Sequence, residues 1–182
     1  MKIVVTGVPG VGKSTVMNGV CEKLNYRIMN FGDVMLEKGK EFGVKNRDEI
    51  RKLPLEKQRE LQRLAGEYLG TMENIIIDTH MSIKTPSGFL PGLPEWVLKA
   101  INPSMLVLIE ADPASIDLRR KKDESRHRDK EDINGIELHQ MMNRYFAASC
   151  SILTGATVVI IKNEDGKVNE AVDLLVKMIS YG

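Results

Sequence analysis

Residues 7–15 have the residue types and the spacing of a phosphate-binding loop. They read Gly-Val-Pro-Gly-Val-Gly-Lys-Ser-Thr, which fits the pattern of two glycines with four residues between them, followed by Lys and Ser. Glycine lets the backbone curl with its N–H groups facing an anion, and a side chain there would block the phosphate. Lys13 would then reach the β- and γ-phosphates, and the Ser14 hydroxyl would bind the Mg²⁺ that bridges them. The pattern predicts a nucleoside triphosphate site made by Gly7, Val8, Pro9, Gly10, Val11, Gly12, Lys13, Ser14 and Thr15.

The residues on either side of this segment predict the elements that position it. Residues 2–6 are a short β-branched run suited to a buried parallel strand. Residues 14–24 carry apolar side chains at helical spacing. A strand, a loop and a helix in that order distinguish a phosphate loop from the alternative, a glycine-rich turn with an exposed lysine.

The rest of the chain alternates short apolar runs with helical patterns. Further strands are predicted at residues 26–31, 74–78, 104–110 and 156–161, and helices at 33–40, 48–69 with a break near Pro54, 94–101, 113–122, 133–154 and 169–179. This alternation predicts a mostly parallel sheet with helices on both faces and a ligand at the carboxyl ends of the strands. No repeat or linker divides the 182 residues, so a single domain is expected.

Composition limits the classes of partner. Lys and Arg number 26 and Asp and Glu 25, so the net charge of +1 provides no general attraction to nucleic acid or to an anionic membrane. No apolar run approaches the roughly 20 residues of a membrane span. Cys21 and Cys150 fall on predicted helices and suggest neither a disulfide framework nor a metal site. We therefore expect a cytoplasmic protein with no nucleic-acid or membrane partner.

Residues 119–130 are a charged segment rich in arginine, with almost no apolar content. By itself such a run is typical of a solvated loop or helix end. Beside a phosphate loop it has a second interpretation, because the planar guanidinium donates two parallel hydrogen bonds to a phosphate. The segment is then predicted to be a mobile lid that closes over the triphosphate and excludes water.

Taken in order, these segments resemble the nucleoside monophosphate kinases, and more closely the archaeal type of adenylate kinase. The second predicted strand ends near Gly32-Asp33, residues 47–54 look like the archaeal insert, and the third strand leads into Asp78-Thr79-His80. Residues 83–94, Ile-Lys-Thr-Pro-Ser-Gly-Phe-Leu-Pro-Gly-Leu-Pro, are the most specific match, and Asn143-Arg144 follows the arginine segment in family order. The resemblance covers nearly the whole chain.

The resemblance implies an α/β fold, a P-loop three-layer α/β/α domain over residues 1–182 with a five-stranded parallel sheet in the order 2-3-1-4-5. It also implies a small monophosphate-binding insert at 30–70 and an arginine-rich lid at 119–132. The implied activity is reversible, Mg²⁺-dependent phosphoryl transfer between ATP and AMP to give two ADP. Archaeal members are commonly trimers, so a homo-oligomer, by resemblance a homotrimer, is expected.

The same resemblance implies roles for particular residues. Lys13 follows the transferring group, Arg119 lies over the ATP base, and the catalytic arginines Arg126, Arg128 and Arg144 close on the phosphates. Ser14 holds the metal, together with Asp78 acting through water. The AMP side is assigned to Gly32, Asp33, Arg51 and Lys84, with Lys84 near the place of an arginine in the bacterial form. Simpler alternatives are a turn or helix cap for Asp78 and Asp33, an exposed helix arginine for Arg51, and surface ion pairs for the lid arginines.

Two other functions remain open from the residues alone. One is a nucleotide kinase that acts on UMP, CMP or dTMP, because a few contacts select the base. The other is a P-loop ATPase or assembly factor of the same fold, in which transfer to AMP is secondary. The helix predicted at residues 133–154 also carries Met141, Met142, Tyr145 and Phe146. This apolar group suits either a fully buried helix or a subunit contact.

Overall fold

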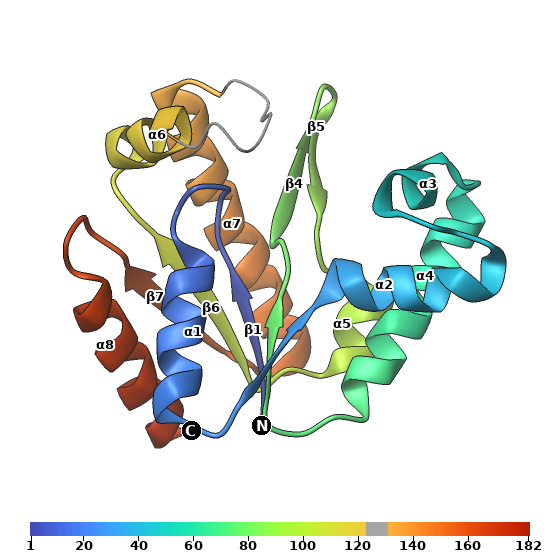
Figure 1. Ribbon diagram of the computed structural model, residues 1–182, viewed down its shortest axis with the longest axis horizontal. Helices are drawn as coiled ribbons and strands as arrows, with labels where there is room; N and C mark the ends of the chain where they lie inside the picture. Colours follow the sequence, from blue (N-terminus) through green and yellow to red (C-terminus); the bar gives the residue numbers. More distant parts are fainter. Residues whose placement is uncertain (123–130) are drawn as a thin grey trace.

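The computed structural model describes residues 1–122 and 131–182, and its centre is a five-stranded parallel sheet (Figure 1). The strands of this sheet are β1 (Lys2–Thr6), β2 (Arg27–Asn30), β3 (Ile75–Asp78), β6 (Met105–Glu110) and β7 (Thr157–Lys162). Their order is β2-β3-β1-β6-β7, which is the predicted 2-3-1-4-5 when the strands of this sheet are numbered along the chain. The predicted fold class is confirmed.

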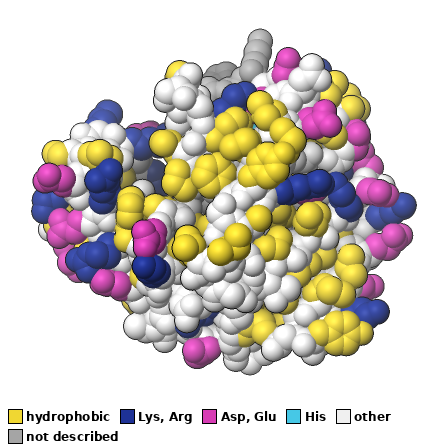
Figure 2. All heavy atoms as spheres, turned by 180° about the vertical axis from the view of Figure 1, so that it is seen from behind, with side chains coloured by type: hydrophobic (Ala, Val, Ile, Leu, Met, Phe, Trp, Pro, Cys, Tyr) yellow, Lys and Arg dark blue, Asp and Glu magenta, His cyan; other side chains and the backbone are white. Residues whose placement is uncertain are grey.

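Helices cover both faces of the sheet. On one face lie α1 (Lys13–Lys23) and α8 (Val168–Tyr181); the other face is covered by α4 (Leu55–Gly70), α5 (Glu95–Ile101) and α7 (Ile133–Thr154). The short helix α6 (Pro113–Lys122) follows β6 and packs on α7. Figure 2 shows hydrophobic side chains gathered on the face that α7 covers. Within the two described ranges, no helix has the length and apolar character needed to cross a membrane.

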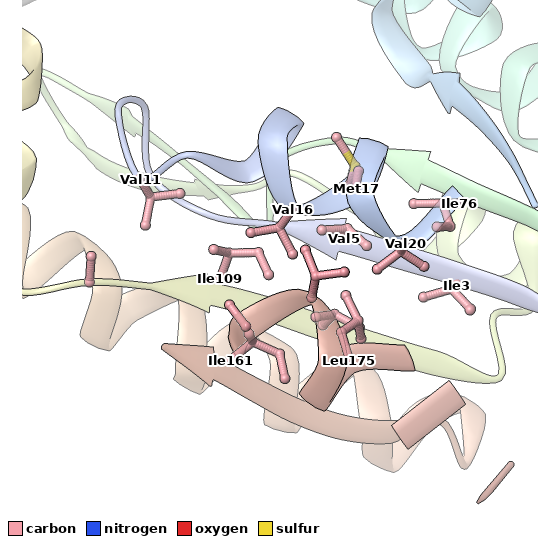
Figure 3. Close-up of a cluster of buried hydrophobic side chains, with 14 of the residues drawn as sticks. Ile3, Val5, Val11, Val16, Met17, Val20, Ile76, Ile109, Ile161 and Leu175 are labelled. Carbon is pink, nitrogen blue, oxygen red and sulfur yellow. The ribbon is translucent and has the colours of Figure 1, made fainter. Parts of the chain in front are cut away.

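The core has two parts because the β1 side chains alternate across the sheet. Ile3 and Val5 face α1 and α8 and pack with Val16, Val20 and Leu175 (Figure 3). Val4 points to the other face and joins a cluster that includes residues of α4, α5 and α7. β1 is central and buried on both faces, so the loop that follows it begins from a fixed point.

The chain between β2 and β3 forms a helical insert beside the sheet. It consists of α2 (Phe31–Gly39), a one-turn 3-10 helix η1 (Lys40–Phe42), α3 (Arg47–Lys52) and α4. A separate small core of Val44, Ile50 and Leu61 holds α2, α3 and α4 together. Pro54 separates α3 from α4, as the sequence predicts, because proline has no N–H to continue a helix.

Two features differ from the prediction. β2 ends at Asn30, and Phe31 already belongs to α2, because the Asn30 side chain accepts a hydrogen bond from the Asp33 N–H and caps that helix. Residues 82–91 form a hairpin of β4 (Ser82–Thr85) and β5 (Gly88–Pro91) that was not predicted. Within residues 1–122 and 131–182 its strands pair only with each other, and their sequence does not alternate clearly between polar and apolar residues.

Candidate active site

The phosphate loop runs from the end of β1 to the start of α1. Gly10 and Gly12 have φ of 86° and 87°, the left-handed region in which residues with a Cβ are strained. A Cβ on Gly7 would lie 2.7 Å from the carbonyl oxygen of Ile109, so β6 leaves no room for a side chain there. The loop therefore has the tight turn and close packing that its glycines predict, and it presents the N-terminus of α1 to a ligand.

Three side chains from later in the chain hold the loop from outside. Asn163, just after β7, and Arg119 on α6 both donate to the Val11 carbonyl, at 2.8 and 3.1 Å. Arg119 also pairs with Asp165 and donates to the Asn163 carbonyl at 2.9 Å. Arg120 Nε donates to the Pro9 carbonyl at 2.7 Å. The structure thus brings Arg119 to the loop and adds Arg120, which the sequence analysis missed. The place of Arg119 over the ATP base stays a prediction.

Lys13 points across the carboxyl ends of the central strands. Its ammonium forms an ion pair with Oδ1 of Asp78 and donates to the Thr79 carbonyl at 3.0 Å. The side chains of Lys13 and Asp78 are only 15% and 17% exposed, so the pair is shielded from water and salt. β1 and β3 are neighbours in register, with Val5 beside Asp78, which explains why the loop lysine meets this carboxylate.

The residues at this point fit a Mg²⁺ site. Within the described chain, Oδ1 of Asp78 is buried and its one close partner is the Lys13 ion pair, since it receives no hydrogen bond of normal geometry. Ser14 lies exposed in the first turn of α1, next to Lys13. No cluster of three or more His, Cys, Asp or Glu side chains suited to a metal occurs among the described residues. One carboxylate and one hydroxyl suit Mg²⁺, which keeps waters and binds substrate phosphates.

The start of the insert lies beside Asp78. Asn30, at the end of β2, donates from Nδ2 to Oδ2 of Asp78 at 3.0 Å. Arg47 of α3 donates to Asn30 Oδ1 at 2.9 Å and pairs with Asp33 at 2.5 Å. Arg47 also lies against Gly32, where a Cβ would meet its guanidinium carbon at 3.2 Å. Gly32 and Asp33 are therefore close to the Lys13 side of the site, and Arg47 is an arginine that the sequence analysis missed.

The other two residues expected on the AMP side lie elsewhere in this structure. Arg51 is on α3 with its side chain 81% exposed, and it pairs with Asp48 at 3.4 Å. Lys84 is on β4 and pairs with Glu131 at 3.0 Å. Among the described residues neither side chain has a hydrogen bond or an ion pair with the loop or with Asp78, and their role in binding AMP stays a prediction.

Glu131 lies among basic side chains from three elements. It accepts from Lys84 of β4 and from Arg120 of α6, both at 3.0 Å, and the His139 ring of α7 lies 3.6 Å away. Burial alone would raise the pKa of this carboxyl, but the hydrogen bonds from His139, Lys84 and Arg120 outweigh it and lower the pKa to about 2. Glu131 is therefore a charged carboxylate that connects Lys84 of the hairpin with Arg120, the residue that donates to the phosphate loop.

Arg144 pairs with Glu110 in this structure, and its expected role in closing on the phosphates stays a prediction. It donates two hydrogen bonds to Glu110, at 2.7 and 2.5 Å, and Lys162 contacts the same carboxylate at 2.7 Å. Burial raises the pKa of Glu110, but these partners lower it overall. The pair lines a cavity of about 720 Å³ between α6, α7 and the end of β7. The preceding residue of α7, Asn143, accepts a hydrogen bond from Ser82 of the hairpin. Neighbouring residues of a helix project about 100° apart, so Asn143 and Arg144 face different ways.

Arg126 and Arg128 lie outside the described residues, as do residues 123–130 of the expected lid. The remaining geometry is that of an anion site. A tight loop at a helix N-terminus, a partly buried lysine and a carboxylate lie together at the carboxyl edge of a parallel sheet.

Comparison with known proteins agrees with this geometry. Residues 6–137 match the family model described as an AAA domain, and this range includes the loop, Asp78 and the insert. The fold, the site and this match define a phosphate-loop kinase. The adenylate kinase of Thermoplasma volcanium is 57% identical over 180 residues, covering 98% of this chain and 99% of that protein. The chain belongs to the adenylate kinase family, a family of phosphotransferases.

Other relatives support the same assignment. The adenylate kinase of Methanopyrus kandleri is 54% identical over 97% of this chain and 96% of that protein. Among solved structures, a shikimate kinase from Bacteroides thetaiotaomicron aligns over 99% of this chain and 98% of its own, with a TM-score of 0.63 and 17% identity. A shikimate kinase from Acinetobacter baumannii aligns over 99% and 93%, with a TM-score of 0.64 and 14% identity. At such identities the two structures show the fold alone.

Proposed function

We propose that this chain catalyses the reversible transfer of the γ-phosphoryl group of ATP to AMP, which gives two ADP. One observation carries the proposal: the loop lysine, Lys13, meets the strand-end carboxylate Asp78 at the site where the acceptor insert begins. Donor and acceptor elements therefore converge on one point. Full-length similarity to curated adenylate kinases supports the same reaction.

The chain contributes position and charge rather than an acid or base. An acceptor phosphate oxygen is already a nucleophile, so holding two anions in line and neutralising them supplies most of the catalysis. The backbone N–H groups of the loop bind the donor phosphates, while Lys13 leaves Asp78 and follows the transferring group. Ser14 and Asp78, the latter through water, would hold Mg²⁺, which supplies positive charge to the phosphates when bound.

The donor and acceptor sides use different parts of the chain. Arg119, fixed between the loop and Asp165, is suited to lie beside the donor nucleotide. Residues 30–70 are the monophosphate-binding insert, with Gly32 and Asp33 at its base and Arg47 added to the expected Arg51. Residues 119–132, with Arg126 and Arg128, stay predicted to be the lid.

A panel of acceptors tests the function. The protein is mixed with Mg²⁺-ATP and each nucleoside monophosphate in turn, and diphosphate formation is followed. We expect rapid ADP production with AMP and little with UMP, CMP or dTMP. A pyrimidine preference would instead assign the chain to another nucleoside monophosphate kinase. Slow hydrolysis that no acceptor changes, but RNA or a partner protein stimulates, would indicate the ATPase alternative.

The oligomeric state is a further part of the proposal. The outer face of α7 exposes Met141, Tyr145 and Ile152, at 41%, 58% and 86%, and the neighbouring edge strand β7 exposes Ile160. A run of large apolar side chains at helical spacing suits a subunit contact, so we propose a homotrimer built on this face. Sedimentation should give three times the mass of 20.4 kDa, and a monomer at micromolar concentration would contradict it. A cytoplasmic location stays a prediction.

A further inference from the structure

Asn30 contacts both halves of the site with one side chain. It is the last residue of β2, and its register partner in the parallel pair with β3 is Asp78. Side chains at paired positions of neighbouring strands point to the same face, which places the amide beside the carboxylate. Nδ2 of Asn30 donates to Oδ2 of Asp78 at 3.0 Å. The Asp78 carboxylate is thus held from one side by Asn30 and from the other by Lys13.

The amide oxygen of Asn30 faces the acceptor side. It accepts from the backbone N–H of Asp33 at 3.2 Å, which caps α2, and from Nη2 of Arg47 at 2.9 Å. A shift of α2 or α3 on acceptor binding would therefore act on the same planar amide that orients Asp78. The amide group donates from its nitrogen and accepts at its oxygen, so it can contact Asp78 and Arg47 at the same time. An ionised carboxylate cannot donate, and the shorter side chain of serine has no second polar atom to span the two partners.

The geometry points to Asn30 as a positioning residue that links the Mg²⁺-side carboxylate Asp78 to the start of the acceptor insert. This inference rests on the proposed adenylate kinase activity. It assigns Asn30 no contact with either nucleotide. Residues that orient a metal-side ligand in this way typically change activity by about tenfold to a hundredfold when altered. A residue that only caps a helix would change stability instead.

Two substitutions separate the link from the cap. Asn30→Ser keeps a capping oxygen but removes the amide that reaches Asp78, and Asn30→Asp keeps the cap and the Arg47 contact but replaces the donor with a carboxylate. Asn46→Ser is the matched control, because Asn46 caps α3 in the same way and contacts Glu49 rather than Asp78. We expect kcat to fall at least about tenfold in both Asn30 variants, with a smaller change in KM for AMP. Asn46→Ser should behave as the unaltered protein.

A second readout is independent of turnover and of metal. In the full-length protein labelled with ¹⁵N-asparagine, the side-chain amide signals of Asn30 are assigned by their absence in Asn30→Ser. AMP alone, and a non-hydrolysable ATP analogue alone, should each shift these signals, both without Mg²⁺. Signals that respond to neither ligand, or to only one of them, would overturn the link. So would an Asn30→Asp protein that is folded and has the kcat of the unaltered protein. Failure of the unaltered protein to phosphorylate AMP would instead overturn the proposed function.

Discussion

Lys13→Ala should reduce phosphoryl transfer from ATP to AMP by about a thousandfold, the upper range for loss of one preorganised charge at a transition state. The reason lies in the geometry of the loop. Lys13 starts α1 directly after Gly12 and extends over the carboxyl edge of the sheet to Asp78 and the Thr79 carbonyl. Among the described residues, no other ammonium lies in this position, so its charge has no substitute. Both kcat and kcat/KM should fall, because the charge acts on the transferring group.

The same substitution, Lys13→Ala, should have only a modest effect on the free energy of unfolding. Removing the ammonium leaves the mostly buried Asp78 with the hydrogen bond from Asn30, so we expect a loss of about 1 to 2 kcal/mol in the free energy of unfolding. Lys23→Ala is the matched control. Lys23 is on the same helix and pairs with Asp173, but it is half exposed and far from the loop. Lys23→Ala should retain activity and lose less than about 1 kcal/mol. A Lys13→Ala protein with more than a tenth of the original activity would contradict the role of Lys13.

Local patterns were sufficient to predict most of the fold. The phosphate loop, the five strands of the main sheet and the break at Pro54 each depend on a few adjacent residues, and the structure contains all of them. The hairpin was missed because β4 and β5 stabilise each other rather than following a local pattern. A turn signal was present at Pro86 to Gly88, where Gly88 has a φ of 125°.

The partners of long charged side chains could not be predicted in the same way. Arg144 directly follows Asn143 on α7, yet the two side chains have different partners: Asn143 contacts the hairpin and Arg144 contacts Glu110. Arg47 and Arg120 lie in segments that the sequence analysis had marked, but their partners, Asn30 and the Pro9 carbonyl, are distant in sequence. Which arginine of a cluster reaches the site depends on packing between elements, and a single sequence does not contain that information.

Glu131→Ala should cause a large loss of stability, about 3 kcal/mol, because it leaves the mostly buried Arg120 guanidinium without its counter-charge. The Glu131 side chain is 8% exposed, and that of its partner Arg120 is 10% exposed. Lys84 is 47% exposed and can regain water, so it contributes less. The effect should appear in chemical unfolding as a lower midpoint with the same slope.

Two further variants separate charge from shape. Glu131→Gln keeps the volume and the acceptor oxygen, so it should lose less than Glu131→Ala. Glu164→Ala is the control for removing an acid, because Glu164 is 57% exposed and pairs with Lys167 on the surface. That change should have little effect on stability, because water already solvates both partners of the pair. Equal losses for Glu131→Ala and Glu164→Ala would contradict the buried cluster.

The pH dependence of stability gives an independent signature of Glu131. Its pKa in the folded protein is about 2, against an ordinary value of 4.5, so unfolding releases a carboxylate that binds protons more readily. A lowered pKa stabilises the folded state at pH values above the ordinary pKa, and this contribution disappears as the pH falls from about 5 toward about 2. The difference in unfolding free energy between the unaltered protein and Glu131→Gln should therefore be full at pH 7 and shrink with acid. Because Arg120 also contacts the Pro9 carbonyl, removing the charge of Glu131 by Glu131→Gln should loosen the support of the phosphate loop. Hydrogen exchange of the loop amides at pH 7, compared between the unaltered protein and Glu131→Gln, would measure that change, and equal protection in the two proteins would show that Glu131 does not transmit its charge to the loop.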